Sequence, residues 1–455
     1  MFHNQKFSNS YNFKSTNPMK KVTFLVLLCL LSFSGFSQTP QTLRVINKQL
    51  TLTNGDTVTL RGINYPLIDD GGISLSNAAQ YQHKIDQAAL TGANCIRLPW
   101  YTNGKHWRDV QTPGTINGYV NNGHLSNIIG YCIQKGMIPI LELHDPGFIT
   151  CSNDWTYFNS TVKNWWKSPE VLELIEEHEE HLIINLANEF GYVMWGNDGA
   201  LNTFKTNYNT LISELRALNV DVPIMIDAPD CGQSSTQLLS IAESMVTSDP
   251  DHNLIFSAHA YWYSYANTQA AVQTKLNQAN NTNVCFVLGE VANTQDDATC
   301  GQYSLANLYP IILQEACTRN IGWLAWTYDQ DCSSPRELTS DGEFANLTTY
   351  GNDIVYNTTY GLISGTCNAQ PVMATNALTA TKTLTAYPNP ITETVSFTHA
   401  TEIKQVQVYN LLGTLVKTIS SGFTNVGMHD LSAGVYLFKA TTLDGRTYQQ
   451  KIIKN

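Results

Sequence analysis

The sequence has few charged side chains. Only 14% of its 455 residues are Asp, Glu, Lys or Arg, and the formal net charge is −11. Such a chain lacks the basic surface that attracts nucleic acid or anionic membranes, so neither is expected as a partner. Asn, Thr, Ser, Tyr and Trp are frequent instead. A surface of this kind suits an uncharged polar ligand.

Metal-binding patterns are also missing. The ten cysteines form no CxxC motif and no Cys/His spacing typical of structural zinc. The stretch ELIEEHEEH at 173–181 places His178 and His181 three residues apart, whereas zinc hydrolases use an i, i+4 pair. We therefore expect a solvated helix face there, with no metal and no cofactor.

Long apolar runs are absent after the N-terminus, so no later segment is expected to span a bilayer. Near the start, Met19 and two lysines precede the run VTFLVLLCLLSF, and the small residues Gly35 and Ser37 follow. This pattern predicts a signal peptide region over 1–37 with the true start at Met19. The protein is expected to be secreted or held at the outer cell surface.

Export permits disulfides, and nine cysteines remain after Cys29 leaves with the signal peptide. Cys95 and Cys285 lie in apolar runs and are expected to be buried thiols. The other candidates lie in loop-like sequence and are expected to form disulfides of open connectivity: Cys151, Cys231, Cys300, Cys332 and Cys367.

Two regions with different sequence patterns follow the signal peptide, joined by a linker. In 38–366, apolar runs alternate with stretches long enough for a helix, and 367–383 is an Ala/Thr-rich linker. From 384 to 455, short alternating segments with Gly and Asn-Pro turns predict a small antiparallel β-sandwich. The chain is thus divided into a large and a small domain.

The large region contains eight apolar runs with helix-length spacing. Continuous apolar runs with helices between them are typical of parallel strands buried on both faces, and eight of them favour a closed (β/α)8 TIM barrel over a doubly wound sheet. An Asn-Gly hairpin at 51–57 is expected to plug the barrel. The runs are 58–66, 94–100, 138–145, 182–189, 223–229, 255–261, 284–290 and 322–329.

Polar residues gather at the C-terminal ends of these runs. In a TIM barrel all such ends open onto the face that holds the active site. Any one of them taken alone would more often be a satisfied core or capping group, but their joint occurrence favours a site. They are Arg97, His144 with Asp145, Asn188 with Glu189, His259 with Tyr261, Glu290 and Trp326.

Glu189 and Glu290 end the fourth and seventh runs and face each other across the barrel mouth. Two facing carboxylates cannot both ionise easily, so one is expected to act as an acid while the other stays charged. Glycoside hydrolysis uses such a pair. Asn188 is placed to hold a sugar 2-hydroxyl, Arg97 and Tyr261 to keep the nucleophile ionised, and Trp326 to stack on a sugar ring.

The segments NCIRLPW, LELHD, IINLANE, SAHAYW, VLGE and GWLAW are similar in order and spacing to the strand-end motifs of glycoside hydrolase family 5, the cellulase and mannanase family. The resemblance covers nearly all of 42–366. It implies a retaining mechanism with Glu189 as acid/base and Glu290 as nucleophile. Arg97, His144, Asn188, His259, Tyr261 and Trp326 would surround the sugar, and the carboxyl groups would lie about 5 to 5.5 Å apart.

The expected substrate is a β-1,4-linked plant polysaccharide, cleaved by a monomeric endo-acting enzyme. The segments DAPDCGQ at 227–233 and LTTYG at 347–351 look like bacterial mannanases, yet mannan and glucan remain nearly tied. A cellulase or xyloglucanase is the alternative, and a non-catalytic sugar-binding barrel is a further one. Aromatic residues near 155–166 and 262–265 either stack on sugars or belong to the core.

The region from 384 to 455 resembles the C-terminal sorting domain of the type IX secretion system. The resemblance implies a secretion machinery as partner, with the domain either cleaved off or used for surface attachment. A carbohydrate-binding module is the rival interpretation. Its aromatic residues fit core positions better than an exposed flat strip.

Overall fold

A computed structural model describes residues 42–67, 74–102, 115–145, 148–193, 197–296, 302–329, 331–368, 386–397, 400–410, 414–443 and 447–455. The signal peptide region 1–37 with Met19, nearly all of the linker 367–383, and Cys300 lie outside these residues. Among the described residues, no helix combines the length and the apolar character needed to cross a membrane.

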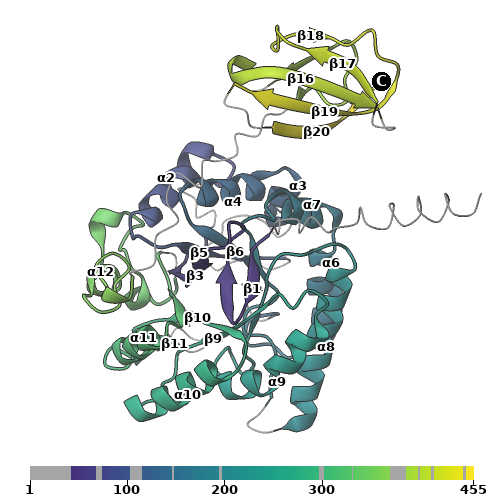
Figure 1. Ribbon diagram of the computed structural model, residues 1–455. Helices are drawn as coiled ribbons and strands as arrows, with labels where there is room; N and C mark the ends of the chain where they lie inside the picture. Colours follow the sequence, from purple (N-terminus) through teal and green to yellow (C-terminus); the bar gives the residue numbers. More distant parts are fainter. Residues whose placement is uncertain are drawn as a thin grey trace, which may run out of the picture. The chain divides into compact units, whose positions relative to one another are not determined.

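Eight parallel strands close into a barrel (Figure 1). Each strand falls within or overlaps one of the eight apolar runs, so the predicted TIM barrel is confirmed and the doubly wound alternative is wrong. The strands are β4 (Arg61–Asn64), β5 (Cys95–Trp100), β6 (Ile138–Leu143), β7 (Ile183–Asn185), β8 (Ile224–Asp227), β9 (Leu254–His259), β10 (Cys285–Val291) and β13 (Gly322–Ala325).

Part of the barrel interior is filled by apolar side chains. Cys95, Ile140, Ile183, Met225 and Ile255 belong to one buried cluster inside the strands. Interior layers of branched residues are the usual filling of such a barrel. The closed core fixes the strand ends, and with them the side chains at the barrel mouth.

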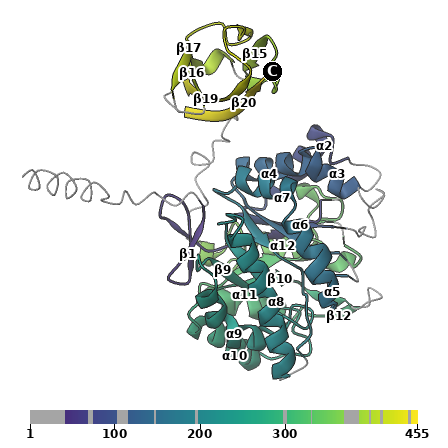
Figure 2. The same cartoon turned by 90° about the vertical axis from the view of Figure 1, so that its right-hand side faces the viewer.

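Helices surround the barrel on its outer side (Figures 1 and 2). Several begin at a side-chain cap: Asn77, Asn197 and Thr268 each accept a hydrogen bond from a backbone N–H of the first turn. The helices are α2 (Ala78–Ala89), α3 (Thr115–Asn121), α4 (His124–Gln134), α5 (Trp155–Tyr157), α6 (Lys163–Trp166), α7 (Pro169–Glu177), α8 (Asp198–Arg216), α9 (Ser235–Ser248), α10 (Gln269–Asn281), α11 (Tyr309–Thr318) and α12 (Thr349–Tyr356), with the π-helical turn η1 (Phe158–Val162).

Short 3-10 turns and a second hairpin complete the barrel domain. The hairpin pairs β11 (Thr294–Asp296) with β12 (Gln302–Ser304) in the antiparallel sense. The 3-10 turns are η2 (Ser334–Arg336), η3 (Phe344–Asn346) and η4 (Thr366–Asn368), and η5 (Ala400–Glu402) lies in the C-terminal region.

The predicted hairpin is present and has a third strand. β1 (Arg44–Ile46), β2 (Gln49–Thr51) and β3 (Thr57–Val58) form an antiparallel sheet. The Asn-Gly turn lies between β2 and β3, where Gly55 adopts a φ of 91°. Leu50 of β2 belongs to the same buried cluster as the barrel interior, so the sheet plugs one end of the barrel.

The C-terminal region forms two antiparallel sheets around one apolar core, as predicted. Alternate strand residues such as Val406 and Val408 are fully buried in that core. One sheet contains β14 (Ala386–Tyr387), β15 (Thr394–Phe397) and β18 (Val426–Gly427). The other contains β17 (Leu415–Ile419), β16 (Ile403–Asn410), β19 (Gly434–Thr442) and β20 (Thr447–Lys454).

Disulfides join Cys151 to Cys231 and Cys317 to Cys367. Cys332 is also disulfide-bonded. Cys317 was not among the predicted disulfide candidates; it lies in the last turn of α11. Of the expected buried thiols, Cys95 is free and buried, whereas Cys285 is free and only partly buried; Cys132 is a further free, buried cysteine.

The prediction of a solvated helix face at 173–181 is only partly confirmed. Helix α7 ends at Glu177, and both His178 and His181 are half-buried rather than exposed. The Ser126 hydroxyl donates to Glu177 Oε2 and lies 2.8 Å from His178 Nε2. Neither histidine belongs to a potential metal-binding group among the described residues.

Candidate active site

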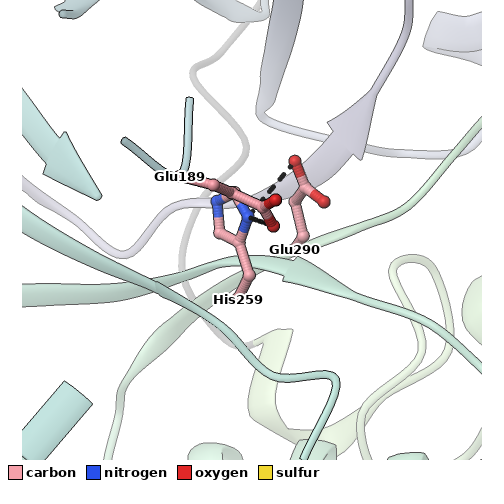
Figure 3. Close-up of side chains that lie close together, drawn as sticks. All are labelled: Glu189, His259 and Glu290. Atoms are coloured by element: carbon pink, nitrogen blue, oxygen red, sulfur yellow. Dashed lines mark hydrogen bonds and ion pairs between the residues drawn. The ribbon is translucent and has the colours of Figure 1, made fainter. Parts of the chain in front are cut away.

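Glu189 and Glu290 come together at the mouth of the barrel. Glu290 lies within β10, and Glu189 follows the end of β7. Each offers an oxygen atom, and His259 a ring nitrogen, that lie within 4.8 Å of one another (Figure 3). Retaining glycosidases place their carboxyl groups about 5 to 5.5 Å apart, whereas inverting enzymes need about 6.5 to 9.5 Å. The close approach fits the retaining geometry.

Hydrogen-bond donors hold both oxygens of Glu290. Arg97 Nη1 donates to Oε1 over 2.8 Å, and the Tyr261 hydroxyl donates to Oε2 over 2.7 Å. The side chain is almost fully buried. Donors aimed at a buried carboxylate favour its ionised form, which is the form that can act as a nucleophile.

Arg97 is held by a network inside the barrel. Its guanidinium donates to Asn185, Asn64 and Asp227 as well as to Glu290. Burial lowers the pKa of Arg97, but Glu142, Asp227 and Glu290 outweigh that effect and the net pKa is raised. Arg97 is therefore a permanent cation beside Glu290.

Glu189 has a different environment. His259 Nδ1 lies 2.7 Å from its Oε1, and the residue has a φ of 52°, in the left-handed region. Burial raises the pKa of Glu189; His259 opposes this shift and the charge of Glu290 adds to it. From the sequence, the second carboxylate was the expected reason for one of the pair to stay protonated, whereas in the structure burial is the larger cause of the raised pKa. Glu189 is thus suited to carry a proton.

His259 and Asp227 form a charged pair beneath the two glutamates. Burial lowers the pKa of His259, but Glu290 and Asp227 outweigh it and raise the pKa to about 10. Burial likewise raises the pKa of Asp227, but His259 and Arg97 hold it far below its usual range. Asp227 Oδ1 lies 3.5 Å from His259 Nε2.

His144 and Trp326 lie against each other. Their rings stack with centroids 5.5 Å apart and an interplanar angle of 14°. Burial lowers the pKa of His144, but Glu142, 3.2 Å from its Nδ1, reverses the shift and the net pKa is raised. The Trp326 indole donates to Asp331. The Arg336 guanidinium lies 5.8 Å from the Trp326 ring centroid.

Asn188 is fixed on both sides of its amide. Its Oδ1 accepts from Arg97 Nη2 over 2.7 Å, and its Nδ2 donates to the Thr150 hydroxyl over 3.1 Å. An amide nitrogen carries two N–H groups, so one donor remains for a ligand. The structure thus brings all eight sequence-predicted site residues to the barrel mouth.

Asp145 and the aromatic residues Trp165 and Trp166, which the sequence placed near the site, contact other parts of the protein instead. Asp145 is fully buried and accepts from Thr102 N and from the Tyr157 hydroxyl, which ties together the loops after β5 and β6. Trp165 and Trp166 are buried in the core. Tyr263, by contrast, is 45% exposed and lies against Tyr303.

Sequence reasoning missed several polar residues that support the site. Asp227 ends β8 inside the fifth run and carried nearly the same signal as the residues at the run ends. Glu142 is next to last in β6 and Asn185 is the last residue of β7, but both lie inside their apolar runs, where nothing separates them from ordinary core positions. Arg336 lies in the 3-10 turn η2, outside the eight apolar runs, and no sequence signal marked it.

Comparisons with known proteins identify the family of each domain. Residues 52–331 match the family model "Cellulase (glycosyl hydrolase family 5)", and residues 385–455 match the model of a secretion system C-terminal sorting domain. The sorting domain directs the protein to the cell exterior or surface. The predicted family, the sorting domain and the extracellular location are therefore confirmed.

Several relatives have mannanase names. A mannan endo-1,4-beta-mannosidase of Cellvibrio japonicus is 28% identical over 322 residues, covering 69% of this chain and 66% of the relative. One from Salipaludibacillus agaradhaerens is 25% identical over 67% of this chain and 87% of its own. The chain thus spans slightly less than two thirds of the Cellvibrio protein.

Solved structures support the fold. The catalytic domain of a mannanase from Streptomyces sp. SirexAA-E has a TM-score of 0.56 at 22% identity, covering 72% of this chain and 94% of that one. The β-mannanase of Thermomonospora fusca has a TM-score of 0.55 at 21% identity, with coverages of 70% and 96%. The chain belongs to glycosyl hydrolase family 5 and carries a C-terminal secretion sorting domain.

Proposed function

We propose that the protein is a retaining endo-β-1,4-mannanase in which Glu290 is the nucleophile and Glu189 the acid/base. The observation that carries the proposal is the asymmetry of the buried pair. Glu290 accepts hydrogen bonds from Arg97 and Tyr261, whereas burial raises the pKa of Glu189. One carboxyl group is thus prepared to attack and the other to donate a proton.

In the first step, the Glu290 carboxylate attacks the anomeric carbon while Glu189 protonates the leaving glycosidic oxygen. The C–O bond to the leaving group breaks and an ester to Glu290 forms. Glu189 is then a carboxylate. In the second step it takes a proton from water, whose oxygen attacks the same carbon and releases Glu290. Two inversions give net retention.

The surrounding residues position the sugar. The free N–H of Asn188 is placed for the 2-hydroxyl, and the stacked His144 and Trp326 rings form a wall beside the pair. Arg97 lies beside Glu290 and His259 beside Glu189. Their positive charges stay close to the two carboxyl groups while the protonation of these carboxyl groups changes during the reaction. These groups are fixed before substrate binds, which lowers the reorganisation needed in the transition state.

The choice of mannan rests on the relatives named as mannan endo-1,4-beta-mannosidases. A β-glucan is the second candidate, because a relative from Caldicellulosiruptor saccharolyticus, 26% identical over 265 residues, is named "Beta-mannanase/endoglucanase A". A sugar-binding barrel without activity is disfavoured by the presence of both carboxylates.

A reducing-sugar assay on mannan, glucomannan, carboxymethylcellulose, xyloglucan and xylan tests the substrate. The proposal predicts the fastest release from mannan or glucomannan, with a rapid fall in viscosity because cleavage is internal. Fastest release from carboxymethylcellulose or xyloglucan would establish the glucanase alternative. Glu290→Ala is the blank for contaminating activity.

We further propose the domain division 38–366, 367–383 and 384–455 after a signal peptide region of 1–37. The apolar core of the barrel and that of the C-terminal sheets are separate clusters, which supports two independently folded units. We propose that the protein acts as a monomer, and light scattering that gives the mass of two chains would contradict this.

A further inference from the structure

A disulfide lies against the carboxyl group of Glu189. Cys151 is bonded to Cys231, and Cys151 Sγ is 3.3 Å from Glu189 Oε2. Cys151 lies in the loop after β6 and Cys231 in the loop after β8. Glu189 follows β7, the strand between them. The bridge therefore joins the two loops that flank the acid/base candidate.

Backbone hydrogen bonds tie the same three loops together. Gly191 N donates to Ser152 O over 2.7 Å, and Asp230 N donates to Gly191 O over 2.8 Å. In the third loop, Gly232 O accepts from His259 N over 2.8 Å. The bridge thus fixes both Glu189 and the backbone of the histidine that contacts its other oxygen.

Gly232 shows how tightly this third loop packs. It has a φ of 75°, and a Cβ added there would lie 2.7 Å from the His259 ring. Gly232 is the neighbour of Cys231 in the chain. A movement of Cys231 would therefore push Gly232 against the His259 ring or open a gap beside it. The position of the bridge and the position of the histidine are mechanically coupled.

The two carboxyl oxygens of Glu189 have chemically different neighbours. Oε1 faces the charged ring of His259, whereas Oε2 faces a bridged sulfur that has no hydrogen to donate and accepts hydrogen bonds only weakly. Such a neighbour excludes water without stabilising negative charge. The sulfur thus favours the protonated form of the carboxyl group, which is the form that the first step uses.

We propose that the Cys151–Cys231 disulfide is a positioning element for acid/base catalysis, closing the Oε2 side of Glu189 against water and holding the carboxyl group in place. The inference rests on the proposed role of Glu189 and adds a residue pair to it. Because disulfides form in oxidising compartments, full acid catalysis would be reached only after export.

Other charged and titratable groups also face Glu189, and the cysteine substitutions remove none of them. His259 comes from β9, Glu290 from β10, His144 follows β6, Asp227 ends β8, and Tyr192 follows Glu189 on the same loop. The Tyr192 hydroxyl lies 3.6 Å from Cys231 Sγ. A change in the pH profile of the disulfide variant can therefore be assigned to the lost bridge.

The test compares two double variants of the full mature protein. Cys151→Ala/Cys231→Ala removes the bridge at Glu189, and Cys317→Ala/Cys367→Ala removes a bridge between α11 and η4. Each is assayed for kcat/KM against pH on a mannooligosaccharide and on a dinitrophenyl β-mannoside. The dinitrophenolate leaves without a proton, so its release does not need an acid.

For the first variant we expect kcat/KM on the oligosaccharide to fall about 10- to 100-fold, with the basic limb about one pH unit lower. On the dinitrophenyl substrate we expect a loss of less than about threefold. The second variant should keep the wild-type profile and the wild-type ratio of the two substrates, whatever its thermal stability. A lowered basic limb and a changed substrate ratio in the first variant alone would show that its bridge positions the acid and does not merely stabilise the fold.

Equal profiles and equal substrate ratios for both variants would overturn the inference while leaving Glu189 as the acid/base. A Glu189→Gln variant that keeps its basic limb would instead overturn the proposed function. If the first variant does not fold, a Cys317→Ala/Cys332→Ala/Cys367→Ala protein, which keeps Cys151–Cys231 but has lost the bridges of Cys317 and Cys332, is treated with a phosphine reductant in its folded state. The same downward shift of the basic limb is then expected, and an unchanged limb with both thiols titrated would contradict the proposal.

Discussion

At the scale of single residues, Glu189 has an unusual backbone. A φ of 52° is costly for a residue other than glycine, and it persists here because hydrogen bonds and packing on both sides hold the loop. The conformation aims the carboxyl group at Glu290 and His259 (Figure 3). Strain at this position is consistent with a residue retained for its chemistry.

The pH dependence of activity follows from the two environments. Burial raises the pKa of Glu189, so its acid form survives to a higher pH than an ordinary carboxyl group and activity is lost as pH rises through that pKa. In acid, activity falls because Glu290 must be a carboxylate to attack. We expect a bell-shaped profile of kcat/KM. A flat profile through the neutral range would contradict the assignment, and Glu189→Gln serves as the control that lacks the basic limb.

Removal of the Glu189 carboxyl group should depend on the leaving group. Glu189→Ala is expected to lower kcat/KM on mannan by about 10²- to 10⁴-fold, because the leaving sugar alkoxide needs a proton. A dinitrophenyl glycoside should react at nearly the normal rate in the first step and then accumulate the glycosyl-enzyme as a burst. Near-normal activity on the polymer would show that Glu189 is not the acid.

The sequence could predict the strand-end residues because their chemistry converges on one face of the barrel. It could not predict Glu142 and Asn185, because whether a polar residue inside an apolar run faces the interior depends on the pleat and the exact register. Nor could it predict that Cys151 contacts Glu189, since the contact joins loops 38 residues apart in sequence.

At the scale of elements, the barrel strands were predicted well and their neighbours less well. Eight apolar runs gave eight strands because strands buried on both faces need continuous apolar sequence. The aromatic residues after β6 were ambiguous, since Trp165 and Trp166 suit both a sugar platform and a helix that packs on the barrel. Burial shows that they belong to the core.

Two glycines provide a matched test of strand packing. A Cβ at Gly62 in β4 would overlap with the Cys95 backbone, whereas one at Gly118 in α3 would meet nothing within 4 Å. We expect Gly62→Ala to lower the free energy of unfolding by about 1 to 3 kcal/mol. Gly118→Ala should raise it by up to about 1 kcal/mol, because glycine disfavours a helix. Denaturant titrations measure both, and equal effects would contradict the packing.

At the scale of the whole molecule, the chain combines a catalytic barrel with a sorting domain. The two have separate apolar cores and different strand arrangements, parallel in the barrel and antiparallel in the C-terminal sheets. The composition change after residue 366 allowed both to be recognised from sequence. The signal peptide and nearly all of the linker lie outside the described residues and stay predictions.

Deletion of 384–455 should separate export from catalysis. The truncated protein is expected to remain inside the cell, while its kcat/KM on mannan after purification matches that of the full mature chain. The full chain with Glu290→Ala is the matched control, since it should be exported normally and be inactive. Loss of activity in the purified truncated enzyme would show that the tail contributes to the catalytic fold.

The anomeric configuration of the product that Glu290→Ala forms with azide shows whether Glu290 is the nucleophile. Removal of the nucleophile should abolish hydrolysis, and azide should enter the vacated space and attack a dinitrophenyl β-mannobioside from that side. We expect an α-mannobiosyl azide in the NMR spectrum, with dinitrophenolate as the leaving group. A β-azide, or hydrolysis of mannan at a near-normal rate without azide, would contradict the assignment of Glu290 as the nucleophile.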